Sequence, residues 1–189
     1  MRSATRPGHA SAVLYAGDMT SAGQPVHEPL LDAILDSWRR NNTILVNLLR
    51  ALPEDTMDLT AVDGSPTVRG LFMHMHYCRL VFVHEDVPEL GVTVPEGEWR
   101  GERDRDRIAA MLHQSADAVR DAVVTRLQSG RPMDTHYDHP ILLLQHFVWH
   151  EGYHHGQIKL ALKRAGRAFD DEEIGRVTWD VWMEKDTWR

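Results

Sequence analysis

Three histidines in the second half of the chain are spaced so that one helix face could present them to a metal ion. His146, His150 and His154 follow one another at intervals of four residues within LLLQHFVWHEGYHHGQIKLAL, residues 142–162. Side chains four residues apart lie on adjacent turns of one helix face, and this face is otherwise largely apolar, as is typical of a face that packs inward. An inward imidazole loses its hydration unless a hydrogen bond or a metal replaces it. We therefore predict a metal site with His150 and His154 as ligands; the alternative is a set of buried histidines that neighbouring groups satisfy.

A third ligand is expected from a second histidine segment, residues 71–80, LFMHMHYCRL. On a helix, His74 shares its face with Leu71 and Cys78, whereas His76 points about 200° away by the rotation per residue of an ideal helix. We therefore choose His74 over His76 as the inward imidazole. Cys78 is interpreted as a buried packing residue rather than a nucleophile.

Three neutral imidazoles leave the 2+ charge of a bound ion uncompensated and leave coordination positions open. At such an ion a bound water has a pKa of about 7, or a bound thiol is held as thiolate. Imidazole suits zinc, nickel, iron and copper, so the sequence leaves the identity of the divalent transition metal open. His146, one turn before His150, is expected beside the ligands, where it could move a proton.

The same helix contains a second motif, HEGYH over residues 150–154, which matches H-E-x-x-H. In that motif two histidines bind zinc and the glutamate is the general base. In a hydrolase of a small amide or ester, Glu151 would move protons while metal-bound hydroxide attacks. A metalloprotease is a further interpretation. The small size of the chain, the lack of an export or pro-segment signal and Gly152 inside the motif argue against a protease.

Four amphipathic segments are long enough to position these side chains. Apolar residues recur at helical spacing over residues 28–52, 66–86, 104–128 and 140–165, and no segment has a convincing strand pattern. The ends of the segments carry recognisable signals. Ser65 is an expected N-cap with Pro66 in the first turn, and Pro53 and Gly130 are expected stops. The sequence therefore predicts an all-α protein, a four-helix bundle with the metal site in its interior.

Composition and charge exclude several classes of protein. The 189 residues carry a formal net charge of -7 without a basic stripe, which argues against nucleic-acid binding by phosphate neutralisation. A single cysteine excludes an intrachain disulfide, and no apolar run reaches the roughly 20 residues that cross a membrane. We therefore expect a cytoplasmic protein that acts on a small molecule and has no nucleic-acid or membrane partner.

The two ends of the chain differ from the segments between them. Residues 1–24 are rich in small and polar side chains, so we expect a disordered leader, with Met19 as a plausible start of translation. Residues 25–189 form the predicted single domain. Trp179, Trp182 and Trp188 gather near the C-terminus. Core packing at the bundle end is their expected role, and a dimer contact or a wall of the site is the alternative.

The two histidine segments together resemble those of a known family. HFVWHEGYHHGQI resembles the fourth-helix signature of the DinB family, and LFMHMHYCRL resembles its second-helix histidine segment. The resemblance extends from Val26 to Gly166, with His155 where the family usually has arginine, a difference expected to alter contacts to an acidic substrate group. It implies an up-down-down-up four-helix bundle, frequently a homodimer, with His74, His150 and His154 as the metal triad.

The resemblance also narrows the activity. The family includes thiol-dependent S-transferases and isomerases that use mycothiol or bacillithiol, and many members with no known reaction. The leading hypothesis is therefore the metal-dependent transfer of a low-molecular-weight thiol to an electrophilic small molecule. A metal-dependent hydrolase and a non-catalytic metal-binding stress protein are the alternatives, with the H-E-x-x-H metalloprotease behind them.

Overall fold

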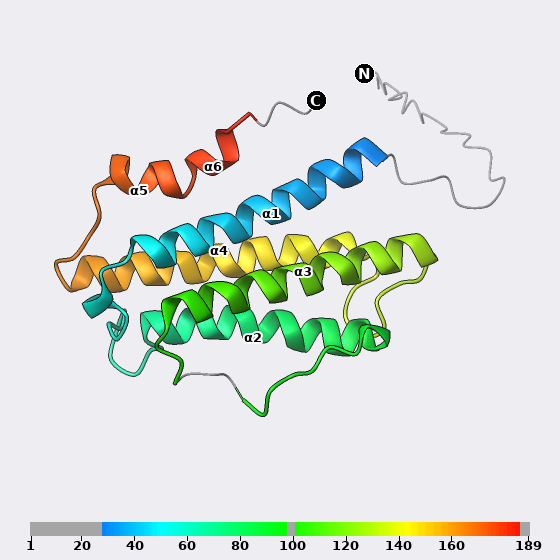
Figure 1. The fold of residues 1–189 in the computed structure, drawn as a ribbon, viewed down its shortest axis with the longest axis horizontal. Coiled ribbons are helices and arrows are strands. Elements are labelled where there is room, and N and C mark those ends of the chain that lie inside the picture. Colours follow the sequence, from blue (N-terminus) through cyan, green and yellow to red (C-terminus); the bar gives the residue numbers. More distant parts are fainter. Residues whose placement is uncertain (1–27, 98–100, 186–189) are drawn as a thin grey trace, which may run out of the picture.

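The computed structural model describes residues 28–97 and 101–185, and within these the protein is all-helical (Figure 1). The elements in chain order are α1 (Glu28–Ala51), η1 (Glu54–Thr56), α2 (Val68–Asp86), η2 (Pro88–Leu90), α3 (Arg105–Ser129), α4 (Ile141–Arg164), α5 (Asp171–Val177) and α6 (Asp180–Met183). The predicted all-α class is confirmed, and each of the four predicted segments is a helix. The predicted leader, Met19 and Trp188 lie outside the described residues.

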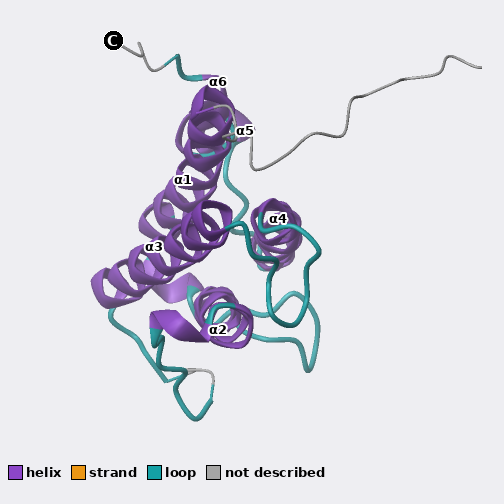
Figure 2. Cartoon of the chain, turned by 90° about the vertical axis from the view of Figure 1, so that its right-hand side faces the viewer, coloured by secondary structure: helices purple, strands orange, loops and turns teal. Residues whose placement is uncertain are grey.

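The four long helices lie side by side around a common interior (Figures 1 and 2). In Figure 1, α1 and α4 run in one direction and α2 and α3 in the other, and the long segment between α2 and α3 returns the chain to the end where α2 began. The short α5 and α6 pack outside, against α1. No helix among the described residues is long and apolar enough to cross a membrane.

Local capping explains where two of the helices begin and end. The Asp104 side chain accepts hydrogen bonds from the backbone N–H groups of Asp106 and Arg107, and Gly130, at φ 64°, ends α3 in the left-handed region that glycine favours. The expected cap of α2 at Ser65 is wrong. Thr67 is the N-cap, and its hydroxyl accepts from the Gly70 N–H at 3.0 Å.

Two apolar clusters fill the interior, and a polar layer separates them along every long helix. One cluster contains Leu48, Leu49, Phe72, Met75, Leu112 and Ile158, and the other contains Trp38, Val83, Val119, Val123, Leu143 and Phe147. Between these positions in sequence lie Asn42 on α1, Arg79 on α2, Ser115 on α3 and Glu151 on α4, all buried. The predicted histidine ligands lie on the neighbouring turns of α2 and α4, so they are close to this polar layer.

The face of α2 that was predicted to point inward is not its most buried one. His74 and Cys78 are only partly buried, whereas His76 is 4% exposed and Arg79 is 0% exposed. The preference for His74 as the only inward imidazole of α2 is therefore wrong. The reason is that α2 packs more extensively against α3 than against α4, and the row with His76 faces α3, where the backbone of Met111 is its neighbour.

The C-terminal tryptophans line the outside of α1 rather than fill the core. Trp179 and Trp182 are 40% and 41% exposed. Arg40 of α1 anchors this segment, because its Nη1 donates to the carbonyl oxygens of Val181 at 2.5 Å and of Glu184 at 2.9 Å. The expectation of core packing at the bundle end is therefore wrong for these two residues.

Candidate metal centre

The structure brings His74 of α2 against His150 and His154 of α4. The ring centroids lie 5.4 Å apart for His74 and His150, 4.9 Å for His74 and His154, and 4.4 Å for His150 and His154. The two residues of α4 come from successive turns, as their four-residue spacing requires. The site is therefore formed at the contact of two helices that are distant in sequence.

Two ring nitrogens of the cluster, one from His150 and one from His154, face each other. His154 Nε2 lies 3.0 Å from His150 Nε2. His154 Nδ1 lies 2.7 Å from Gln157 Oε1, and since the Gln157 amide nitrogen donates to the Tyr153 hydroxyl at 3.0 Å, its oxygen is the acceptor. The proton of neutral His154 is therefore on Nδ1, and the lone pair of Nε2 points toward His150.

His150 has the properties of a ligand rather than of a satisfied core histidine. Its Nδ1 is buried without a hydrogen-bond partner among the described residues. Burial first, and then the neighbouring His154 and His74, lower the pKa of His150 to about 4, so its ring is neutral at pH 7. Two neutral imidazoles with converging Nε2 atoms can bind one divalent cation. The donor set therefore fits a transition metal.

Cys78 belongs to this cluster, which the sequence did not predict. Its Sγ lies 3.5 Å from His74 Nε2, and ligand atoms of His74, Cys78 and His150 all lie within 4.8 Å of one another. A thiolate is a strong ligand for zinc and for other divalent ions. The signal in the sequence was the position of Cys78 four residues after His74, which on a helix places the two side chains together. Its interpretation as a packing residue alone is therefore incomplete.

His146 lies beside the cluster and not in it. Its ring centroid is 6.0 Å from that of His150, and its Nδ1 is 2.5 Å from the Tyr137 hydroxyl. The ring of Phe82 packs edge-on against it at 5.5 Å. The predicted proton transfer by His146 stays a prediction, and Tyr137 is a partner that the sequence did not reveal, because it lies in the connection before α4.

The carboxylate of Glu151 is bound by residues of α1 and α2 that do not belong to the histidine cluster. It is 0% exposed, and its two carboxylate oxygens accept hydrogen bonds from Arg79 at 2.6 and 2.8 Å and from the Asn41 amide at 2.5 Å. Arg79, also 0% exposed, continues to Asn42 Oδ1 and to the Leu112 carbonyl oxygen, both at 2.8 Å. A carboxylate that is enclosed in this way contacts neither solvent nor the histidine cluster. This placement does not support its expected role as general base or, with it, the H-E-x-x-H interpretation.

The remaining histidines of the two segments face other neighbours. His155 lies against α1 and the C-terminal tryptophans, where burial lowers its pKa to about 4. Its predicted influence on an acidic group of a substrate at the metal is therefore not supported. His76 is buried toward α3, and burial lowers its pKa to about 4 as well.

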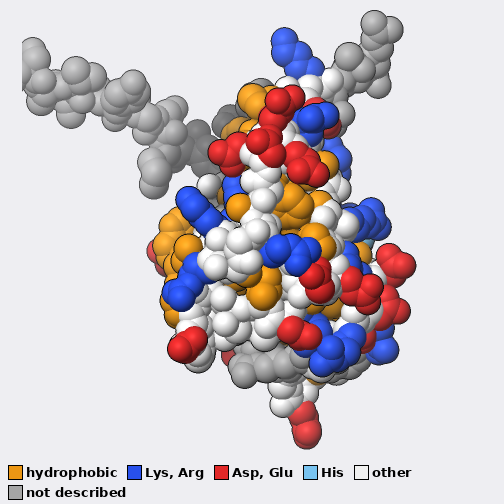
Figure 3. Space-filling model, turned by 90° about the vertical axis from the view of Figure 1, so that its left-hand side faces the viewer, with side chains coloured by type: hydrophobic (Ala, Val, Ile, Leu, Met, Phe, Trp, Pro, Cys, Tyr) orange, Lys and Arg blue, Asp and Glu red, His pale blue; other side chains and the backbone are white. Residues whose placement is uncertain are grey.

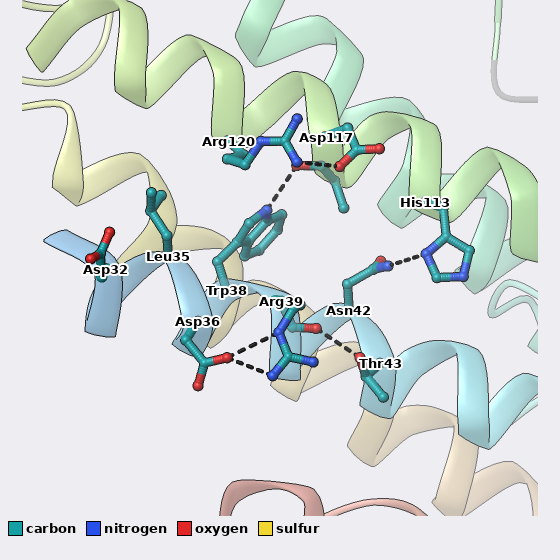
Figure 4. A pocket seen from close by; sticks show the side chains of 11 residues that line it. Asp32, Leu35, Asp36, Trp38, Arg39, Asn42, Thr43, His113, Asp117 and Arg120 are labelled. Atoms are coloured by element: carbon teal, nitrogen blue, oxygen red, sulfur yellow. Dashed lines mark hydrogen bonds and ion pairs between the residues drawn. The ribbon is translucent and has the colours of Figure 1, made fainter. Parts of the chain in front are cut away.

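A cavity of about 490 Å³ lies on another side of the protein, between α1 and α3 (Figure 4). It shares no residue with the histidine cluster. Four of its five charged side chains form two pairs, Asp36 with Arg39 and Asp117 with Arg120, and the fifth is Asp32. On its floor, the amide of Asn42 faces a ring nitrogen of His113 at 3.1 Å. These pairings leave no converging set of reactive groups, and we assign the candidate site to the histidine cluster.

Comparison with known proteins gives one match. Residues 27–179 match the model of the DinB family. Neither a curated protein nor a solved structure matches the chain.

Proposed function

The chain belongs to the DinB family, and from this premise we propose that it is a metal-dependent enzyme that transfers a low-molecular-weight thiol, such as mycothiol or bacillithiol, to an electrophilic small molecule. In this proposal His74, His150 and His154 hold one divalent transition metal (zinc, nickel or iron) inside an up-down-down-up four-helix bundle. The proposal also includes a cytoplasmic location and a homodimer.

One observation carries the proposal. The Nε2 atoms of His150 and His154 face each other at 3.0 Å while Gln157 holds the proton of His154 on Nδ1. Without a cation, the two Nε2 atoms fit each other only if His150 carries its proton on Nε2. A bound ion accepts the lone pairs of both Nε2 atoms.

A divalent ion at this place supplies the positive charge that keeps a bound thiol as thiolate. His146 would provide a proton donor beside it. Burial, with a smaller contribution from Asp86, raises the pKa of Tyr137 to about 12, so its hydroxyl keeps its proton and is able to donate to His146 Nδ1. In our proposal it does so, which leaves the proton of His146 on Nε2. His146 is therefore suited to donate a hydrogen bond to the electrophile or its leaving group, and less suited to accept a proton from the thiol.

Cys78 supports a second candidate, a non-catalytic metal-binding protein. If its thiolate joins the three histidines, the ion has four protein ligands, which is typical of structural sites and leaves no position for a substrate. A hydrolase has less support than either, because Glu151 is held by Arg79 and Asn41.

Cobalt substitution tests the proposal. In Cys78→Ser loaded with cobalt, adding mycothiol, bacillithiol or a simpler thiol at millimolar concentration should add a sulfur-to-metal charge-transfer band. His154→Ala is the control without a site, and His155→Ala, one residue away, should behave as the parent. No band with any of these thiols would contradict thiol transfer. A band in the wild-type protein before thiol is added, lost in Cys78→Ser, would favour the closed four-ligand site.

A further inference from the structure

Cys78 is the single cysteine of the chain, and it lies at the contact of α2 and α4 that forms the histidine cluster. On α2 it follows His74 by one helical turn, as His154 follows His150 on α4. Ligand atoms of His74, Cys78 and His150 all lie within 4.8 Å of one another. Each of the two helices therefore brings two potential ligands, at four-residue spacing, to the same place.

The distances within this group are close to those between donors that share one ion. In a tetrahedral zinc site with bonds of about 2.0 Å to nitrogen and about 2.3 Å to sulfur, two nitrogens lie about 3.3 Å apart, and a sulfur and a nitrogen lie about 3.5 Å apart. Cys78 Sγ is 3.5 Å from His74 Nε2, and His150 Nε2 is 3.0 Å from His154 Nε2. The thiol of Cys78 is therefore placed as a fourth ligand beside the three imidazoles.

The surroundings of Cys78 also suit a thiol that is not bound to an ion. His74, Cys78 and His150 are each partly exposed, so this side of the cluster borders on solvent. The side chain of Cys78 packs against the apolar cluster that contains Val83 and Phe147. A neutral cysteine behaves as a small apolar side chain. Cys78 therefore has a favourable position in both forms, as a thiolate ligand and as a free thiol.

We propose that Cys78 is a displaceable ligand, which occupies the fourth position of the ion in the resting protein and gives it up to an incoming low-molecular-weight thiol. This inference rests on the proposed thiol transfer. In the exchange the incoming thiol binds as thiolate, and its proton passes to the Cys78 sulfur, which leaves as a thiol. One thiolate replaces another, so the number of ligands and the total charge at the ion are unchanged. Cys78 thus accepts the proton that His146 is less suited to accept, and it keeps the position closed until a thiol arrives.

The test uses full-length wild-type protein labelled with ¹³C at the Cβ of cysteine. Because the chain has a single cysteine, NMR shows one labelled signal, which reports on Cys78 alone. An equimolar amount of zinc should shift this signal, because the sulfur changes from a thiol to a metal-bound thiolate. Unlabelled β-mercaptoethanol should then return the signal to its metal-free position while elemental analysis shows that the zinc is still bound. Half of this effect is expected at a millimolar concentration, on the order of the effective concentration of a tethered ligand.

Two controls accompany the titration. Ethylene glycol, the oxygen analogue of β-mercaptoethanol, should leave the signal in its zinc-shifted position. In the double variant His150→Ala and His154→Ala, which lacks both ligands of α4, the same amount of zinc should not shift the signal.

No shift with zinc in the wild type would show that Cys78 only contacts His74, and it would overturn the inference. Thiol transfer would not fall with it, because the charge-transfer band of cobalt-loaded Cys78→Ser with an external thiol tests that proposal separately. A zinc-induced shift that persists at about 10 mM β-mercaptoethanol, roughly ten times the expected midpoint, would overturn the displacement and make Cys78 a permanent ligand.

Discussion

His154 differs from its neighbour His150 in how the second ring nitrogen is held. Gln157 accepts from His154 Nδ1 at 2.7 Å, and Tyr153 holds the amide of Gln157 at 3.0 Å. Metal-binding histidines are commonly oriented by such a hydrogen bond. His150 has no corresponding partner for its Nδ1 among the described residues. His154 is therefore the preorganised ligand of the pair, and Gln157 is its positioning residue.

We expect Gln157→Leu to lower zinc affinity about 10- to 100-fold, the usual cost of losing a group that orients a ligand. Gln157→Glu should restore it, because a carboxylate also accepts from Nδ1. Competition with a chromophoric chelator measures the affinity. Gln145→Leu, an exposed glutamine of the same helix, is the control. Equal affinities for Gln157→Leu and the wild type would show that His154 needs no such partner.

At the scale of the helices, the Arg79–Glu151 pair joins α2 to α4, and Asn41 and Asn42 of α1 complete its hydrogen bonds. Both charged side chains are 0% exposed, and the guanidinium also lies 4.7 Å from the centroid of the Trp38 ring. Taking two charges out of water is costly, and their mutual attraction offsets this only while both are present. The pair therefore fixes how three helices meet beneath the histidine cluster.

We expect Glu151→Leu to lower the free energy of unfolding by about 3–5 kcal/mol, because it leaves Arg79 buried without its counter-charge. Arg79→Met combined with Glu151→Leu should recover most of this loss. Urea denaturation of the single and double variants measures the coupling. A single variant as stable as the wild type would show that Glu151 is not a structural residue and would reopen its catalytic role.

The attachment of α6 to α1 depends on Asp36, which holds Arg40 in place. Arg40 donates to Asp36 Oδ2 at 2.5 Å and to two carbonyl oxygens of the α6 segment. Burial acts to raise the pKa of Asp36, but hydrogen bonds from Arg40 and Arg39 outweigh it, and the pKa is lowered from 3.8. Because the folded pKa is below the unfolded value, this stabilisation is present above pH 4 and is lost as the pH falls through the folded pKa.

Hydrogen exchange of the amides of residues 180–185 measures this attachment. After correction for intrinsic rates, protection in the wild type should be constant from about pH 7 to 5 and should fall below about pH 4. Asp36→Asn should show, at every pH, the weaker protection that the wild type shows only below about pH 4. If Asp36→Asn keeps full protection at neutral pH, Arg40 does not need the carboxylate.

At the scale of the whole molecule, one side of α4 is exposed and uncharged up to residue 160. Trp149 is 72% exposed and Tyr153 is 57% exposed, and their rings stack at 6.5 Å. Leu142 and Leu160 add to the same face at 46% each. The end of the molecule that Figure 3 shows has a different surface, on which acidic and basic side chains lie among apolar ones. We propose this apolar face of α4 as the contact of the homodimer.

We expect the protein to be a dimer at micromolar concentration and Trp149→Lys to be a monomer, because in a symmetric contact each substitution places two charges in the interface. Light scattering after size-exclusion chromatography gives the mass. Gln114→Lys, on an exposed position of α3, adds the same charge elsewhere and should stay dimeric. A dimer that survives Trp149→Lys would place the contact on another face.

The sequence by itself determined the helices, most of their ends and the grouping of His150 with His154. The third helix begins beside Asp104 and ends at Gly130, as expected, because capping interactions join residues only a few positions apart. The four-residue spacing places His150 and His154 together on any helix, whatever surrounds it. These features depend on local geometry alone.

The tertiary structure decided the burial and the binding partners of side chains whose contacts lie on another helix. Glu151 was expected to act in catalysis, and Arg79 and Asn41 bind it instead. His76 was expected to face away, and α3 covers it. Cys78 was interpreted as packing, and it lies at the histidine cluster because α2 and α4 meet there. The rotation per residue gives the angle between two side chains of one helix. Which of these side chains is buried, and by which residues, depends on the helices that pack against it.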